Sequence, residues 1–265
     1  MRTLSLWSEQ LVRPAGNAHL VLFYEYTSSL SNAVALYLAD GLGRGEAAVV
    51  IETRAHWNEF KKALERRGHF AAALEEEGRL IVKDARETLG SFMRNGMPDA
   101  DLFRKTLGAV FSLLDLRGHA KVRAYGEMVA LLWQDGNYDA AIRLEQLWNE
   151  LGETRRFSLL CAYRGNSLAP EFHGRPAQAI YREHTHLVPP EDYERLTQAV
   201  NLAMDEQFGE TEAASLRPII ASSKRRLAVL PGAQASLLWI QSHLPDRIDD
   251  VLTSARRHYA HTVDR

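Results

Sequence analysis

Short apolar runs alternate with helical stretches over the first 165 residues of the chain. The apolar runs are five to seven residues long and most are continuous, which is typical of strands that are buried on both faces. The stretches between them repeat their apolar positions with the period of an amphipathic helix. This alternation predicts an α/β fold with a mainly parallel sheet and helices on both faces. The expected strands are 19–24, 47–52, 79–84, 121–125 and 157–163.

The pattern changes in the last third of the chain. Residues 165–190 contain glycine, proline and several histidines without a clear period, so we expect them to be irregular. Beyond Pro190 no strand pattern occurs, and three helical stretches follow. We therefore predict two parts: an α/β domain over residues 1–195 and a helical C-terminal extension over residues 196–265, serving in dimerisation or in contact with a partner. The expected helices are 191–208, 212–230 and 233–261.

Composition narrows the class of protein. The chain has 265 residues, of which 46% are hydrophobic and 25% charged, as in an ordinary globular protein. Its 32 basic and 34 acidic residues give a net charge of -2, so direct nucleic-acid binding is not expected. A single cysteine, Cys161, allows no internal disulfide. With no signal peptide or apolar run of about 18 residues, we expect a cytoplasmic protein without a membrane partner.

Ligands of parallel α/β sheets bind beyond the carboxyl ends of the strands. Polar and aromatic side chains gather at these predicted ends, and they are our candidates for ligand binding, with no catalytic residue among them. The candidates are Tyr24, Tyr26, Thr27, Ser28, Ser29, Glu52, Asp84, Arg123, Glu127 and Tyr163.

The first strand-to-helix turn is where an ATPase would carry its phosphate-binding loop. Here residues 25–31 contain neither the glycines that let the backbone approach a phosphate nor the lysine that neutralises it, so ordinary ATP hydrolysis is not expected. Thr27, Ser28 and Ser29 would hold a polar ligand at a helix N-terminus, or simply cap that helix. Tyr24 and Tyr26, with Trp133 and Tyr163, would wall a cavity, or pack in the core.

Metal binding is not predicted. The carboxylates Glu52, Asp84 and Glu127 would bind a divalent cation at one edge of the sheet, or form salt bridges and helix caps. The fragment His184-Thr185-His186 has no third ligand at a familiar spacing and suggests a surface loop. Cys161 lies among apolar residues and is expected to be a buried, inert thiol. The basic runs 224–226 and 256–258 would contact phosphate or form solvated faces. We therefore expect no metal and no cofactor.

One long run resembles a known family. Residues 123–133 read Arg-Ala-Tyr-Gly-Glu-Met-Val-Ala-Leu-Leu-Trp and continue through Gly136-Asn137 to Leu147-Trp148-Asn149-Glu150-Leu151. This run is similar to the MEDS domain, the methanogen/methylotroph sensory domain, and the resemblance extends over about residues 15–195. Shorter matching pieces are His19 with Phe23-Tyr24, Gly78-Arg79-Leu80, Leu159–Tyr163 and His184 with Val188-Pro189-Pro190.

The resemblance implies a RecA-like three-layer α/β fold, related to the clock-ATPase branch, and a sensory role for small molecules in bacterial or archaeal signalling. Together with the missing phosphate loop, it predicts a non-catalytic sensor that binds a small molecule at the strand ends and relays this through its helical tail. We expect a homodimer and a signalling protein as partner, with transcription regulation as an output. Two alternatives stay open: a divergent RecA-like nucleotide-binding ATPase, and an interaction scaffold that regulates a kinase or transcription factor.

Overall fold

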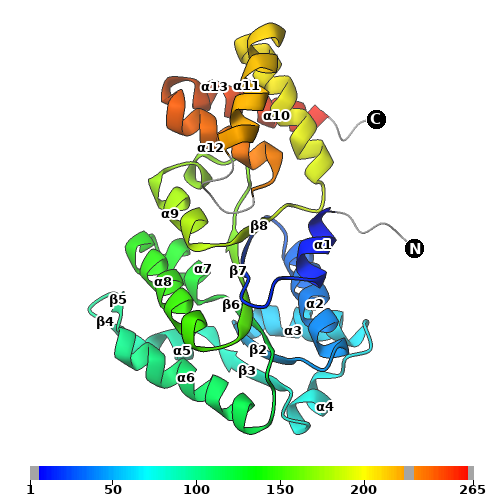
Figure 1. Ribbon diagram of the computed structural model, residues 1–265, viewed down its shortest axis with the longest axis vertical. Coiled ribbons are helices and arrows are strands. Elements are labelled where there is room, and N and C mark those ends of the chain that lie inside the picture. Colours follow the sequence, from blue (N-terminus) through cyan, green and yellow to red (C-terminus); the bar gives the residue numbers. More distant parts are fainter. Residues whose placement is uncertain (1–5, 224–229, 262–265) are drawn as a thin grey trace.

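The structure, a computed structural model, describes residues 6–223 and 230–261. Six parallel strands form one sheet in the order β3-β2-β6-β7-β1-β8, seen edge-on in Figure 1. A separate two-stranded hairpin, β4 (Met93–Arg94) and β5 (Met97–Pro98), lies outside it. The sheet strands are β1 (His19–Tyr24), β2 (Ala47–Glu52), β3 (Leu80–Asp84), β6 (Val122–Gly126), β7 (Phe157–Arg164) and β8 (His186–Val188).

Helices cover both faces of the sheet, which makes three layers (Figure 1). One face carries α1 (Leu6–Val12), α2 (Thr27–Gly43), α3 (Arg54–Glu65) and α4 (Ala71–Glu76). The other face carries α5 (Ala85–Phe92), α6 (Ala100–Leu116), α7 (Met128–Gln134), α8 (Tyr138–Thr154) and α9 (Arg175–Glu183).

Alternate side chains of each strand enter the two cores. On β1, Leu20 and Leu22 belong to the cluster under α2 and α3, whereas Val21 and Phe23 belong to the cluster under α6 and α8. A strand that is covered on both sides needs apolar residues at every position. This explains the continuous apolar runs and confirms the predicted α/β fold class.

The segment 165–190 is more regular than expected. It contains a short 3₁₀ helix (Pro170–Phe172), the helix α9 and the edge strand β8. Strand β8 pairs with β1 through only three residue pairs, from Leu20↔His186 to Leu22↔Val188. Elements this short leave almost no periodic signal in a sequence, and β8 is recognisable only by its partner strand. Helix α1 was likewise not predicted.

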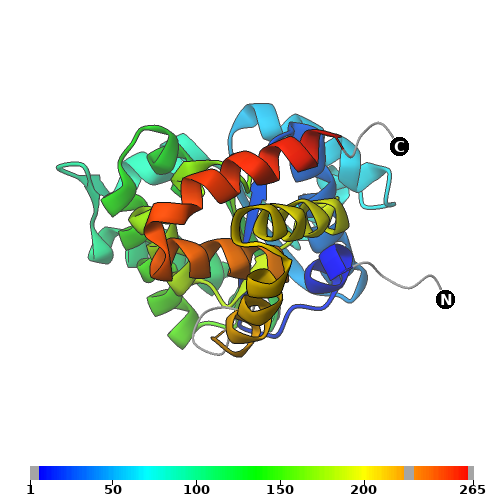
Figure 2. The ribbon, with the colours of Figure 1, turned by 90° about the horizontal axis from the view of Figure 1, so that it is seen from above.

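In the described part of the chain, four α-helices and the short 3₁₀ helix Pro245–Arg247 follow the sheet, and the α-helices are drawn at the top of Figure 1. Figure 2 shows them from above, with α10 lying alongside α13. Their apolar residues, among them Val200, Leu237 and Val251, join the same buried cluster as Leu187 of β8. The helices are α10 (Tyr193–Phe208), α11 (Glu210–Ser223), α12 (Gly232–His243) and α13 (Ile248–His261), and they confirm the predicted C-terminal helical part.

The sequence allows two interpretations of the basic runs in this part of the chain, as phosphate contacts or as solvated faces. Lys224, Arg225 and Arg226 lie outside the described residues. In the second run, Arg256 Nε donates to the carbonyl of Leu168, while Arg257 and His258 both contact Glu206 of α10. These side chains hold α13 against its neighbours. Across the described parts of the chain, no helix is both long and apolar enough to cross a lipid bilayer.

Candidate functional site

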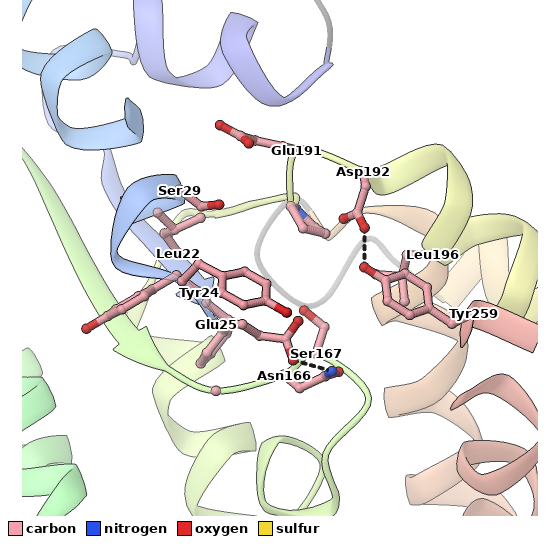
Figure 3. A pocket seen from close by; sticks show the side chains of 14 residues that line it. Leu22, Tyr24, Glu25, Ser29, Asn166, Ser167, Glu191, Asp192, Leu196 and Tyr259 are labelled. Atoms are coloured by element: carbon pink, nitrogen blue, oxygen red, sulfur yellow. Dashed lines mark hydrogen bonds between the residues drawn. The ribbon is translucent and has the colours of Figure 1, made fainter. Parts of the chain in front are cut away.

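A cavity of about 240 Å³ lies between the carboxyl ends of β1 and β7 and the first C-terminal helix. We call it the cleft (Figure 3). The carboxyl ends of β1 and β7 and the segments next to them contribute Tyr24, Glu25, Tyr26, Ser29, Asn166 and Ser167. The residues that lead into α10, together with α10 and α13, contribute Glu191, Asp192, Leu196 and Tyr259. The cleft is therefore shared between the two parts of the chain.

Hydrogen bonds hold the two walls of the cleft. On the α/β side, Asn166 Nδ2 donates to Glu25 Oε1. On the helical side, the hydroxyl of Tyr259 donates to Asp192, and the Arg195 guanidinium lies 4.1 Å from the centre of the Tyr259 ring. Figure 3 shows Tyr24 and Glu25 on one side of the space and Asp192 and Tyr259 on the other. Each wall is thus fixed internally, while the space between them is free for a ligand.

The lining of the cleft is acidic and aromatic. It contains the carboxyl groups of Glu25, Glu191 and Asp192, and none of the described lining residues is lysine, arginine or histidine. Burial raises the pKa of Glu191, and the charge of Asp192 raises it further. The charge of Asp192, which lies 3.9 Å from Arg195 Nη1, thus disfavours ionisation of Glu191, and a positively charged or hydrogen-donating ligand would offset this effect.

A buried polar cluster that includes the cleft residue Tyr24 lies on the side of the sheet that faces α3. We use the name for Tyr24, Glu52, His56, Tyr125 and Glu127. Glu127 accepts a hydrogen bond from the Thr53 amide at 2.8 Å, and its Oε1 lies 2.5 Å from His56 Nδ1. Burial alone would raise the pKa of Glu127, but the contacts with His56 and the Thr53 amide lower it. Glu127 is therefore the ionised member of the cluster.

Three members of the cluster, Glu52, Tyr24 and Tyr125, have side-chain oxygens without hydrogen-bond partners among the described residues. Glu52 is only 2% exposed, and neither of its carboxyl oxygens forms a hydrogen bond with a described residue. Burial, followed by the charge of Glu127, raises the pKa of Glu52 to about 10. The buried hydroxyls of Tyr24 and Tyr125 are also without partners, and burial raises the pKa of Tyr24 to about 12. Unsatisfied buried polar groups cost stability, so their grouping beside a cleft indicates a functional site.

The structure brings five of the predicted ligand-binding residues to this region. Tyr24, Tyr26 and Ser29 line the cleft, and Glu52 and Glu127 belong to the buried polar cluster. Thr27 and Ser28 open α2 without lining the cleft. The N-cap residue of α2 is Tyr26, and its side chain makes no capping hydrogen bond. The interpretation of Thr27, Ser28 and Ser29 as helix caps is therefore wrong.

Three other predicted residues lie elsewhere. Asp84 accepts hydrogen bonds from the amides of Arg86 and Glu87 and caps α5. Arg123 is the second residue of β6, at the amino end of the strand, where it pairs with acidic residues far from the cleft. Tyr163 points to the opposite face of the sheet from Tyr24 and donates to Glu145 at 2.5 Å.

The expected pairing of Tyr24 with Trp133 and Tyr163 in one cavity wall does not occur. Trp133 and Tyr163 pack with Phe172 on the α7 side of the sheet, with ring centres 6.0 Å apart for Trp133–Phe172 and 5.4 Å apart for Trp133–Tyr163. The physical reason is the strand register, because Tyr163 pairs with Phe23 and so points to the same face as Phe23.

Sequence reasoning missed several residues of the site. His56 lies inside an amphipathic helix, where no pattern singles it out, and Tyr125 ends a predicted strand but is not among the predicted ligand-binding residues. Asn166, Asp192 and Tyr259 line the cleft from segments that are distant in sequence from β1. Of the two missed residues of the buried polar cluster, Tyr125 had a usable signal, since it and the predicted Glu127 flank the glycine at the end of a buried strand.

Gly165 offers a test of the cleft's construction. A Cβ atom at this position would lie 1.9 Å and 2.1 Å from two ring carbons of Phe172, whose ring packs on the cleft residue Phe23 at 4.7 Å. We expect Gly165→Ala to displace Phe172 and to lower the free energy of unfolding by about 1–3 kcal/mol, as overpacking does. Urea unfolding followed by circular dichroism measures this change.

Gly90→Ala is the matched control, because a Cβ atom at this helical position meets nothing within 4 Å. It should leave the protein unchanged or stabilise it by about 0.5–1 kcal/mol. Equal effects of the two variants would show that the approach of Phe172 to Gly165 is unimportant.

The protein has a three-layer α/β fold with a cleft at the carboxyl edge of its sheet, which is where proteins of this fold class that bind ligands hold them. Residues 18–178, more than half of the chain, match the model of the family described as MEDS, MEthanogen/methylotroph, DcmR Sensory domain. The protein belongs to this family, whose name describes a sensory domain.

Comparison with solved structures finds the crystal structure of a KaiC-like protein of the archaeon Pyrococcus horikoshii. It is 13% identical in sequence, has a TM-score of 0.44, and the match covers 65% of this chain and 71% of that one. None of the curated proteins compared with the chain matches it significantly.

Proposed function

We propose that the protein is a non-catalytic sensor that binds a small molecule in the cleft and passes its presence to a partner through helices α10–α13. The observation that carries this proposal is the composition of the cleft, whose walls come from both parts of the chain. A ligand that touches Tyr24 and Glu25 on one side and Asp192 and Tyr259 on the other would favour one arrangement of the two parts over another.

The first strand-to-helix connection supports binding over ATP hydrolysis. Only Glu25 and Tyr26 separate the end of β1 from the start of α2. A phosphate-binding loop needs a longer, glycine-rich connection and a lysine to neutralise the phosphates. In this chain the carboxylate of Glu25 stands at that place instead, and it would repel a phosphate.

The lining indicates the chemical class of the ligand. The aromatic rings of Tyr24 and Tyr26 combine with the carboxyl groups of Glu25 and Asp192, while the Tyr259 ring already carries the Arg195 guanidinium. Rings attract cations over their faces, and carboxylates accept hydrogen bonds from ammonium groups. The cavity of about 240 Å³ is smaller than the sites of drug-sized ligands, which begin at roughly 300 Å³. We therefore propose a small amine or another small hydrogen-donating molecule, and not an anion.

Titration calorimetry of the full chain tests this proposal. We expect binding of methylammonium, dimethylammonium or trimethylammonium and none of acetate at the same concentration. Asp192→Asn should weaken the binding at least tenfold, which corresponds to about 1.4 kcal/mol. Glu194→Gln is the matched control, because this residue is two positions away and does not line the cleft.

Two results would contradict the proposal. Equal binding by wild type and Asp192→Asn would place the ligand elsewhere. A magnesium-dependent stabilisation by ATP, with turnover that is lost in Glu127→Gln, would favour the nucleotide-binding ATPase instead.

A further inference from the structure

Four side chains that are able to bind a metal converge inside the α/β domain, apart from the cleft. His19 begins β1, Glu145 lies on α8, Cys161 lies on β7, and His184 follows α9. All four are buried, and one ligand atom of each lies within 4.8 Å of the others. We call them the His-Glu-Cys-His cluster. The proposed sensory function makes no use of them.

Four contacts within the cluster, two of them to Glu145 Oε2 and one to Glu145 Oε1, have lengths close to those between the ligand atoms of a tetrahedral ion. Glu145 Oε2 lies 3.2 Å from His19 Nε2 and 3.3 Å from Cys161 Sγ. Cys161 Sγ lies 3.5 Å from His19 Nε2, and Glu145 Oε1 lies 3.5 Å from His184 Nε2. A tetrahedral metal with bonds of about 2.0–2.3 Å separates its ligand atoms by roughly 3.3–3.7 Å.

Hydrogen bonds outside the cluster fix the orientation of His19. The side-chain nitrogen of Asn149 donates to the carbonyl and to the carboxylate of Glu183, at 2.9 Å and 3.1 Å. The Asn149 oxygen must therefore be the atom that lies 2.8 Å from His19 Nδ1, and it accepts the hydrogen of that nitrogen. A metal-binding imidazole with its hydrogen on Nδ1 directs the Nε2 lone pair into the cluster.

His184 is oriented in the same way. Its Nδ1 lies 2.7 Å from the carbonyl oxygen of Ile180, which accepts hydrogen bonds and cannot donate. Nδ1 therefore carries the hydrogen, and Nε2 offers a lone pair. That Nε2 atom is fully buried and has no hydrogen-bond partner among the described residues. An outer N–H that donates to an oxygen is the usual arrangement of histidines that bind metals.

We propose that His19, Glu145, Cys161 and His184 form a binding site for a divalent transition metal, with zinc as the first expectation. Two imidazoles, a carboxylate and a thiolate are ligands that zinc accepts. The carboxylate and the thiolate carry two negative charges, which the ion's two positive charges balance. When the metal binds, the thiol of Cys161 loses its proton to solvent and its sulfur forms the bond to the metal.

The position of the site indicates a structural role. Its four ligands come from separate elements, so a bound ion would join β1, β7 and α8 to the connection that leads into β8. With four protein ligands no position is left open for a substrate, as in structural zinc sites. A cavity of about 290 Å³ is lined by His19 and Asn149 and lies beside the site, which gives an ion a route of entry.

Metal analysis of the purified full chain tests the proposal. We expect about one zinc ion per chain by mass spectrometry of the metal content. Removing it with a chelator should lower Tm by at least about 5 °C. Adding Co²⁺ to the stripped protein should produce the visible bands of tetrahedral cobalt and the near-ultraviolet charge-transfer band of a cobalt–thiolate bond.

Variants identify the ligands. Cys161→Ser should abolish the thiolate band, and His184→Ala should reduce the metal content severalfold. His186→Ala is the matched control, because this histidine lies two residues away, outside the cluster, and should leave both signals unchanged. Wild-type protein that is folded by circular dichroism but neither contains metal nor gives the thiolate band with Co²⁺ would overturn the proposal. The same signals in Cys161→Ser would also overturn it.

Discussion

Glu52→Gln is expected to make the protein more stable, by about 2–3 kcal/mol near pH 7. The reason is the environment of Glu52, which is 2% exposed and has no hydrogen-bond partner among the described residues. Burial and the nearby charge of Glu127 raise its pKa from 4.5 to about 10. The folded protein must therefore keep a proton on Glu52 at neutral pH, whereas the unfolded chain releases it. Glutamine has a similar shape and is neutral in both states.

The pH dependence follows from the same shift. Between pH 4.5 and about 10 the folded state holds more protons at Glu52 than the unfolded state does, so this group makes the protein less stable as the pH rises. Below that window Glu52 is protonated in both states and its contribution vanishes. The difference in stability between Glu52→Gln and wild type should be near zero at pH 4 and grow between pH 5 and 9.

Urea unfolding of both proteins at pH 5, 7 and 9 measures this difference. Glu59→Gln, an exposed position on α3, is the control and should change stability by less than about 0.5 kcal/mol at each pH. A variant that is less stable than wild type throughout the range would show that Glu52 has a favourable partner in the folded state. If Glu52→Gln gains stability and loses ligand binding, the result would show that Glu52 serves binding at the expense of stability.

Arg123→Met is expected to lower the free energy of unfolding by about 3–5 kcal/mol. Arg123 is 2% exposed and pairs with Asp40 at 3.0 Å and Glu46 at 2.7 Å. Its guanidinium also donates to the carbonyls of Leu11 and Tyr37, at 3.1 Å and 3.0 Å, and so ties α1 to α2. The guanidinium also reaches the carbonyl of Val12 at 3.3 Å, so methionine would leave two carboxylates and three carbonyls without this partner.

Arg44→Met is the matched control for this variant. Arg44 pairs with the same Asp40 at 2.9 Å, but its side chain is 43% exposed. Exposed ion pairs contribute about 0–1 kcal/mol, so the control should lose little stability. Thermal and urea unfolding compare the two variants. Similar small losses in both would mean that solvent reaches the Arg123 network and that its burial does not determine its strength.

The fold was largely predictable because its signal is local. A strand that is covered on both faces must be apolar at nearly every position, and the runs at 19–24 and 47–52 show this directly. Helix α3 was equally visible, since Trp57, Phe60 and Leu64 recur on one face. The edge strand His186–Val188 was not visible, because three residues at the margin of a sheet have no period of their own.

The candidate site was predictable only in part. Strand ends located Tyr24, Glu52 and Glu127 near one edge of the sheet, because the carboxyl ends of parallel strands share an edge. Arg123 was predicted there because it is near Glu127 in sequence. The two residues are four positions apart along an extended strand, so they lie at its opposite ends. Tyr259 could not be assigned, because nothing local relates α13 to β1.

The His-Glu-Cys-His cluster separates the two kinds of information most clearly. By itself the sequence determined the layers, the parallel strands, the helical end and the absence of a phosphate-loop motif, since each depends on neighbouring residues. It pointed to His184 beside His186 and to a buried Cys161, and found no ligand set. Only the tertiary structure brought His19, Glu145, Cys161 and His184 within reach of one ion. The physical reason is that ligation requires atoms to meet in space, and the parallel crossovers bring together residues that are up to 165 positions apart.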